Sequence, residues 1–82
     1  MSAINWTRKA AKQLRKIPSN YQKRIVTAVS ELVNFPNCKG DIKKLVNRDG
    51  YRLRLGNYRI IFDDIGTIIE IQEVKKRDNR TY

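Results

Sequence analysis

The sequence predicts an α+β fold in which an N-terminal helical hairpin packs on a small curved antiparallel β-sheet. Apolar residues recur with helical spacing up to residue 33, and they alternate with basic residues from 51 to 62. Helices that precede a run of strands favour two helices on one face of a sheet, with the other face open. At 82 residues, the chain is expected to be one domain spanning residues 1–82.

The first helix is predicted from Thr7, a suitable N-cap, to Lys16. Pro18 ends this helix, because proline disfavours helical geometry in the residue before it. The short segment Ala3–Trp6 before it is expected to be an edge strand. The apolar residues with helical spacing are Trp6, Ala10, Leu14 and Ile17.

The second helix is predicted to begin at Ser19, which forms a capping-box pattern with Gln22 three positions later. An apolar stripe with a period near 3.6 follows, made of Ile25, Val26, Val29, Leu32 and Val33. The segment 34–37 closes the helix. The first thirty residues hold seven lysines and arginines and no acid, so the hairpin is expected to have a basic outer surface.

The second half of the chain has the pattern of an antiparallel meander. Gly56 and Asn57 separate two alternating runs, which is typical of a two-residue hairpin turn. The expected order is a strand at 42–46, a turn at 47–50, strands at 51–55 and 58–62, a turn at 63–66, a β-rich run at 67–74 and a polar tail. The alternation assigns the apolar residues of the two strands to the core face: Tyr51, Leu53, Leu55, Tyr58, Ile60 and Phe62.

Three arginines are predicted on the opposite face of this hairpin. With the turn at Gly56 and Asn57, Arg54 lies opposite Arg59, and Arg52 lies two residues further along the same face. Like charges directly across a strand pair destabilise it, so this face is expected to bind an anion. A phosphodiester is the favoured anion, because the planar guanidinium group matches phosphate oxygens.

Glu70 is predicted to pair with Arg59 if the turn at 63–66 has four residues, which would place Phe62 opposite Thr67. Two interpretations are open. Glu70 either neutralises Arg59 as a surface ion pair, or it orients Arg59 and exchanges protons. A shift of one residue in register would move every side chain to the other face.

The net charge of +10 favours a polyanion or an acidic protein as partner. The basic residues expected to contact RNA outside the hairpin are Lys43, Lys44, Lys75, Lys76 and Arg80. Tyr82 is the candidate for stacking on a base, and the alternative is that it is disordered or packs on the core.

Several classes of site and location are disfavoured. The chain has no histidine and one cysteine, Cys38, which argues against zinc sites and against a cysteine nucleophile. No stretch approaches the roughly 20 apolar residues of a membrane span, and the N-terminus lacks the features of a signal peptide. A cytoplasmic protein that needs neither metal nor cofactor is expected.

The hairpin Tyr51–Phe62, the β-rich run to Val74, the pair Lys76-Arg77 and Tyr82 resemble the RelE/ParE superfamily of bacterial toxins. The resemblance covers nearly the whole chain and implies a single RelE-like toxin domain with a microbial RNase-like fold. It also implies an acidic, DNA-binding antitoxin that wraps the basic surface. For the RelE branch it implies ribosome-dependent, metal-independent cleavage of messenger RNA in the A site, which inhibits translation.

In this branch a ribose 2′-hydroxyl attacks the adjacent phosphate and leaves a 2′,3′-cyclic phosphate. The resemblance assigns transition-state stabilisation to Arg59, the leaving group to Arg77 and base stacking to Tyr82. Arg52 and Arg54 stand where the best-known member has lysines, and arginine stays protonated in proteins. The general base is therefore assigned elsewhere, with Glu70, Lys44 or Lys76 as candidates, or the reaction relies on electrostatics and substrate geometry.

Two other functions are compatible with the same resemblance, because a fold does not determine a function. One is a ParE-like toxin that poisons DNA gyrase without nuclease activity. The other is a non-catalytic RNA-binding relative, which the loss of the two lysines favours.

Overall fold

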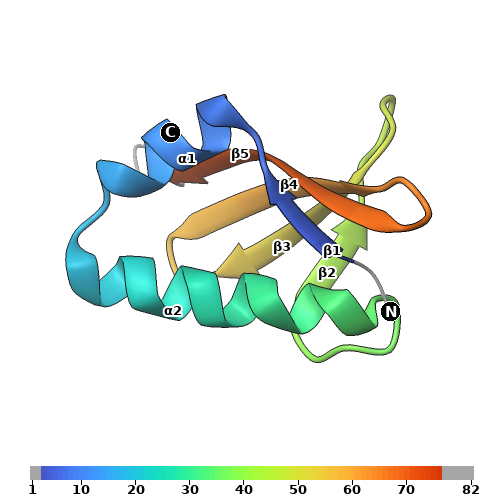
Figure 1. The fold of residues 1–82 in the computed structure, drawn as a ribbon, viewed down its shortest axis with the longest axis horizontal. Coiled ribbons are helices and arrows are strands. Elements are labelled where there is room, and N and C mark those ends of the chain that lie inside the picture. Colours follow the sequence, from blue (N-terminus) through green and yellow to red (C-terminus); the bar gives the residue numbers. More distant parts are fainter. Residues whose placement is uncertain (1–2, 77–82) are drawn as a thin grey trace, which may run out of the picture.

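The computed structural model describes residues 3–76 and confirms the α+β class (Figure 1). The elements are β1 (Ala3–Trp6), α1 (Arg8–Arg15), α2 (Ser19–Ser30), the 3₁₀ helix η1 (Glu31–Asn34), β2 (Asp41–Lys44), β3 (Tyr51–Leu55), β4 (Tyr58–Asp64) and β5 (Ile68–Lys76). No helix within the described residues is long and apolar enough to cross a membrane.

The five strands form one sheet in the order β1-β5-β4-β3-β2. Strands β2 to β5 form the predicted antiparallel meander, and β1 is an edge strand as predicted. However, β1 runs parallel to β5, with Ala3 opposite Ile68 and Trp6 opposite Ile71, so the sheet is mixed. The pairing of β1 with β5 joins segments that are more than sixty residues apart, and no local pattern in the sequence predicts it.

Helix α1 covers the part of the β5 edge that β1 leaves open. Thr7 is the N-cap, as predicted: its Oγ1 accepts a hydrogen bond from the Ala10 amide at 3.2 Å. The same hydroxyl donates to the Ile71 carbonyl at 2.8 Å. Further along, the Val74 amide donates to Gln13 Oε1 at 2.7 Å. The Gln13 side chain therefore pairs an amide of the β5 edge, and the Thr7 hydroxyl adds a second hydrogen bond to the Ile71 carbonyl, which also accepts one from the Thr7 amide at 3.1 Å.

Replacing Thr7 by alanine should lower the free energy of unfolding by about 1–2 kcal/mol, because it removes an N-cap and a hydrogen bond to β5. Denaturant unfolding measures this change. Thr7→Ser retains the hydroxyl and should stay within about 0.5 kcal/mol of the wild type. Equal stability of the alanine and serine variants would show that the hydroxyl contributes nothing.

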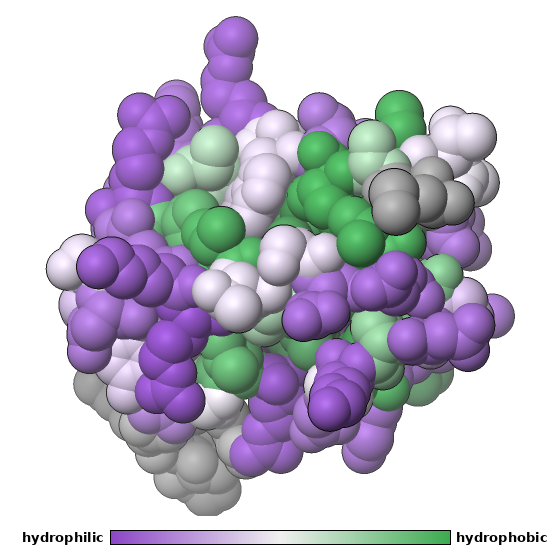
Figure 2. Space-filling model, turned by 60° about the horizontal axis from the view of Figure 1, so that its bottom comes forward, coloured by the Kyte–Doolittle hydropathy of each residue, from purple (hydrophilic) through white to green (hydrophobic). Residues whose placement is uncertain are grey.

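Helix α2 differs from the prediction at its start and along its stripe. Its N-cap is Pro18 and makes no side-chain cap, while Gln22 Nε2 donates to the Ile17 carbonyl at 2.6 Å, so the predicted capping box is wrong. Ile25 is buried, but Val26 is 45% exposed. Two adjacent residues of a helix point about 100° apart, so only one of them faces the sheet. Figure 2, in which the α2 side comes forward, shows apolar patches among hydrophilic side chains.

The core lies between α2 and one face of the sheet. All six residues assigned to the core face of the hairpin belong to this cluster or pack against it, which confirms the alternation. Phe62 is fully buried, with its ring centroid 5.4 Å from that of Phe35 and 5.6 Å from that of Tyr51. Gly56 opens the hairpin turn with φ 58°, a conformation that glycine adopts without strain. The opposite side of the sheet is called the outer face below.

The register between β4 and β5 differs from the prediction. Phe62 pairs with Ile71 instead of Thr67, and Arg59 pairs with Lys75 instead of Glu70. The pairing shifts between Ile61 and Phe62, where a bulge adds one residue to β5. In addition, β4 continues to Asp64 and β5 to Lys76, so the second turn is shorter and the tail begins later than predicted.

Candidate nucleic-acid interface

Two neighbouring cross-strand rows make up the basic part of the outer face. The first row contains Asp41, Arg54, Arg59 and Lys75, in the order β2, β3, β4 and β5. The second contains Lys43, Arg52, Ile61 and Glu73 in the same order. The predicted pairing of Arg54 with Arg59, and the place of Arg52 on the same face, are confirmed. Two acidic residues and five basic residues therefore share this part of the sheet.

The three arginines of these rows have no ionic partner among residues 3–76. Every ion pair within this range involves Glu73, and none includes Arg52, Arg54 or Arg59. The Nε atom of Arg52 is buried and has no hydrogen-bond partner in the same range. Since a guanidinium group carries five N–H donors, this face retains many unused donors for an anion.

Glu73 forms ion pairs with three cations, Lys9, Arg48 and Lys75. Its carboxylate accepts a hydrogen bond from Lys9 Nζ at 2.8 Å and lies 3.7 Å from Lys75 Nζ and 3.8 Å from Arg48 Nη1. The hydrogen bond from Lys9 lowers the pKa of Glu73, against the opposing effect of desolvation, and the charges of Lys75 and Arg48 add to the lowering. Glu73 is therefore a carboxylate at neutral pH.

No sequence pattern indicates that Lys9, Arg48 and Glu73 are parts of this surface. Lys9 and Glu73 are 64 residues apart, and they meet because α1 lies against β5. Arg48 belongs to the segment between β2 and β3, and its Nη2 donates to Gln72 Oε1 at 3.4 Å. Side chains of β5 alternate between the two faces of the sheet, and Glu73 lies on the outer face only in the observed register. The sequence therefore gives no indication that Glu73 belongs to this surface.

Glu70 does not lie beside Arg59. It pairs with Asp63, and Asp63 is four residues from Arg59, about 13 Å along β4. Its Oε1 accepts a hydrogen bond from Gln72 Nε2 at 3.3 Å. The outer face is thus polarised, with the arginines toward the hairpin turn and the acidic pair Asp63 and Glu70 toward the other end.

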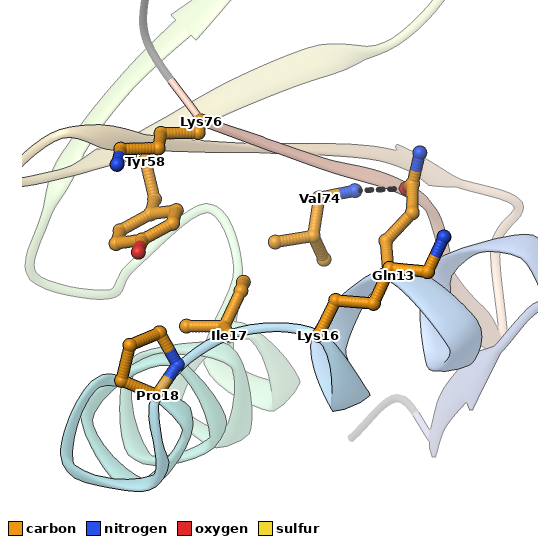
Figure 3. A pocket seen from close by; sticks show the side chains of 7 residues that line it. All are labelled: Gln13, Lys16, Ile17, Pro18, Tyr58, Val74 and Lys76. Carbon is orange, nitrogen blue, oxygen red and sulfur yellow. Dashed lines mark hydrogen bonds between the residues drawn. The ribbon is translucent and has the colours of Figure 1, made fainter.

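Lys43 and Lys75 lie on the outer face, but Lys44 and Lys76 do not. Lys44 pairs with Tyr51 and Lys76 with Tyr58, which are both core-face residues. Lys76 lines a pocket of ≈ 290 Å³ on that side of the sheet (Figure 3). Its other lining residues are Gln13, Lys16, Ile17, Pro18, Tyr58 and Val74. The candidates Lys44 and Lys76 for a general base are therefore separated from Arg59 by the sheet.

Arg77, Arg80 and Tyr82 lie outside the described residues, so their predicted roles stay predictions. Within the described part, no group of three His, Cys, Asp or Glu side chains is placed to hold a metal ion. Burial raises the pKa of the Cys38 thiol, which disfavours the thiolate form.

Comparison with known proteins identifies the class. The family model of the ParE toxin of the type II toxin–antitoxin system parDE matches residues 4–80. The chain is similar to a chain of the RelB–RelE antitoxin–toxin complex from Methanococcus jannaschii, at 32% identity over 88% of each chain with a TM-score of 0.77. It is also similar to a chain of the RelE–RelB complex from Pyrococcus horikoshii OT3, at 28% identity over 98% of each chain with a TM-score of 0.78.

A third similar structure is the isolated Escherichia coli RelE toxin, with a TM-score of 0.78 at 20% identity over 96% of this chain and 87% of that one. At this identity the likeness shows the fold alone. No curated protein matches the sequence. The protein belongs to the ParE toxin family within the RelE/ParE superfamily, and it is a toxin of a type II toxin–antitoxin system.

Proposed function

We propose that this toxin is an endoribonuclease that cleaves messenger RNA in the ribosomal A site and so inhibits translation. One observation carries the proposal: Arg52, Arg54 and Arg59 share the outer face and have no ionic partner among residues 3–76. Surface cations left unpaired next to one another are unfavourable unless a polyanion neutralises them. An extended RNA strand supplies phosphates at repeated intervals along such a face.

In the proposed reaction, the ribose 2′-oxygen forms a bond to phosphorus and the bond from phosphorus to the 5′-oxygen breaks. The 2′-hydroxyl loses a proton and the leaving 5′-oxygen gains one. Arg59, flanked by Arg54 and Lys75 in the first row, is assigned by the resemblance to stabilise the added negative charge on the phosphorane. Arg54 and Arg52 bind the flanking phosphates, and Arg77 and Tyr82 are assigned the leaving group and base stacking by their resemblance to the RelE branch.

The proposed protein partner is a cognate acidic antitoxin, and the proposed location is the cytoplasm. The two archaeal relatives above were solved as toxin–antitoxin complexes, and the net charge of +10 complements an acidic segment. Beside the exposed Val26, a shallow groove of ≈ 370 Å³ between α2 and the hairpin offers apolar contacts. Its lining residues are Lys23, Arg24, Thr27, Ala28, Glu31 and Leu55.

A second candidate function is poisoning of DNA gyrase without nuclease activity, which the matching ParE family model favours. In this second function, the toxin would use the same cations of the outer face to bind an acidic protein or DNA, without cleaving RNA. The arginine set favours the ribonuclease, because the resemblance to the RelE branch assigns transition-state stabilisation to Arg59, which lies on the outer face beside Arg54.

Two parallel assays distinguish these functions: primer extension on a defined message, and detection of DNA breaks with gyrase. The purified toxin is incubated with programmed ribosomes, and in parallel with the message alone and with gyrase and supercoiled DNA. We expect cleavage within the A-site codon that requires ribosomes, with no gyrase-dependent DNA breaks. DNA breaks with an intact message would establish the gyrase function, and RNA binding without either reaction would establish a non-catalytic relative.

A further inference from the structure

Glu73 binds cations from three different parts of the chain. Lys9 comes from α1, Arg48 from the segment between β2 and β3, and Lys75 from β5 itself. Only Lys75 is near Glu73 in sequence. The tertiary structure therefore brings three cations to one carboxylate.

The burial of these groups is unequal. The side chain of Glu73 is 13% exposed, whereas those of Lys9, Arg48 and Lys75 are 64%, 51% and 53% exposed. The carboxylate is covered while each cation keeps about half or more of its surface in solvent. Ion pairs whose cations are this exposed contribute little to folding stability. It holds three cations in place and leaves their outward surfaces free for a second anion.

The cluster adjoins the arginines of the outer face. Lys75 pairs with Arg59 across β4 and β5, and Glu73 occupies the same row as Arg52. Ile61 lies between Glu73 and Arg52 in that row and is only 6% exposed, although it lies on the outer face and outside the core cluster. The stems of long charged side chains cover apolar surface in this way. The bond from Arg48 to Gln72 holds the arginine near this position.

We propose that Glu73 is a positioning residue that organises Lys9, Arg48 and Lys75 into a phosphate-contact site beside Arg59. The inference rests on the proposed ribonuclease function and adds residues to its RNA surface. Without the carboxylate, no anion offsets the repulsion between Lys75 and Arg59, so the Lys75 ammonium group moves away from Arg59 while the backbone pairing stays. The number of cations that face the RNA strand then stays the same, but their positions are no longer fixed. The scissile phosphate is therefore placed less accurately at Arg59.

Glu73→Gln and Asp63→Asn test this inference as a matched pair. Each removes one carboxylate from the outer face and raises the net charge from +10 to +11, but only Glu73 holds cations in the described structure. Both variants should bind an RNA that lacks the reactive 2′-hydroxyl as tightly as the wild type or more tightly. Glu73→Gln should cleave messenger RNA about tenfold more slowly in single turnover, whereas Asp63→Asn should cleave at the wild-type rate.

Side-chain NMR signals of Lys75 and Arg48 test the positioning without relying on cleavage. In the wild type and in Asp63→Asn, the chemical shifts of these side chains should differ from those of freely rotating side chains. In Glu73→Gln the chemical shifts should be those of freely rotating side chains. Undiminished cleavage by Glu73→Gln, or free-rotation signals already in the wild type, would overturn the inference. A wild type that does not cleave any message would refute the proposed function, while the NMR comparison would still decide the role of Glu73.

Discussion

Arg59→Ala should lower the single-turnover rate of messenger RNA cleavage on programmed ribosomes by about 10²–10³-fold, a typical loss for one group that stabilises transition-state charge. The affinity for uncleavable RNA should fall only a few-fold, because the other cations of the outer face still bind phosphates. The measurement combines primer extension with a binding titration. Cells expressing the variant should also grow without arrest.

Arg15→Ala is the matched control for this prediction. Arg15 is an exposed arginine of α1 outside the two rows, so its loss should leave the cleavage rate unchanged. Arg59→Lys keeps the charge but not the guanidinium geometry and should retain part of the activity. Equal cleavage by wild type and Arg59→Ala would remove Arg59 from the chemistry.

Phe62→Ala should lower the free energy of unfolding by about 3–5 kcal/mol, the usual cost of deleting a buried aromatic ring. Phe62 is fully buried in β4 and packs against the rings of Phe35 and Tyr51. A domain of this size is stable by only about 5–15 kcal/mol, so the variant loses much of its stability. Its melting temperature should fall by at least about 12 °C, at about 4 °C or more per kcal/mol.

Denaturant unfolding in the Arg59→Ala background measures this effect without selection against an active toxin. Val46→Ala serves as the control, because Val46 is 81% exposed and its truncation should change stability by less than about 0.5 kcal/mol. A Phe62→Ala variant as stable as the control would mean that this ring does not contribute to the core as described.

The sequence by itself determined the features that depend on neighbours along the chain. The hairpin of β3 and β4, its six core-face residues and the pairing of Arg54 with Arg59 follow from a period of two and a two-residue turn. The N-cap at Thr7 is equally local. These interactions connect residues only a few positions apart, so the pattern of residue types is enough to specify them.

Only the tertiary structure decided which distant segments meet. The parallel pairing of β1 with β5 joins segments from opposite ends of the chain. The position of the turn between β4 and β5 shifts their register from the predicted one, and the bulge in β5 adds one more residue, so Lys75 instead of Glu70 lies opposite Arg59. The tertiary structure also determines that Glu73 lies on the outer face, within reach of Lys9 and Arg48. One added residue changes every later register, and contacts across more than sixty residues depend on how whole elements pack, which no local period encodes.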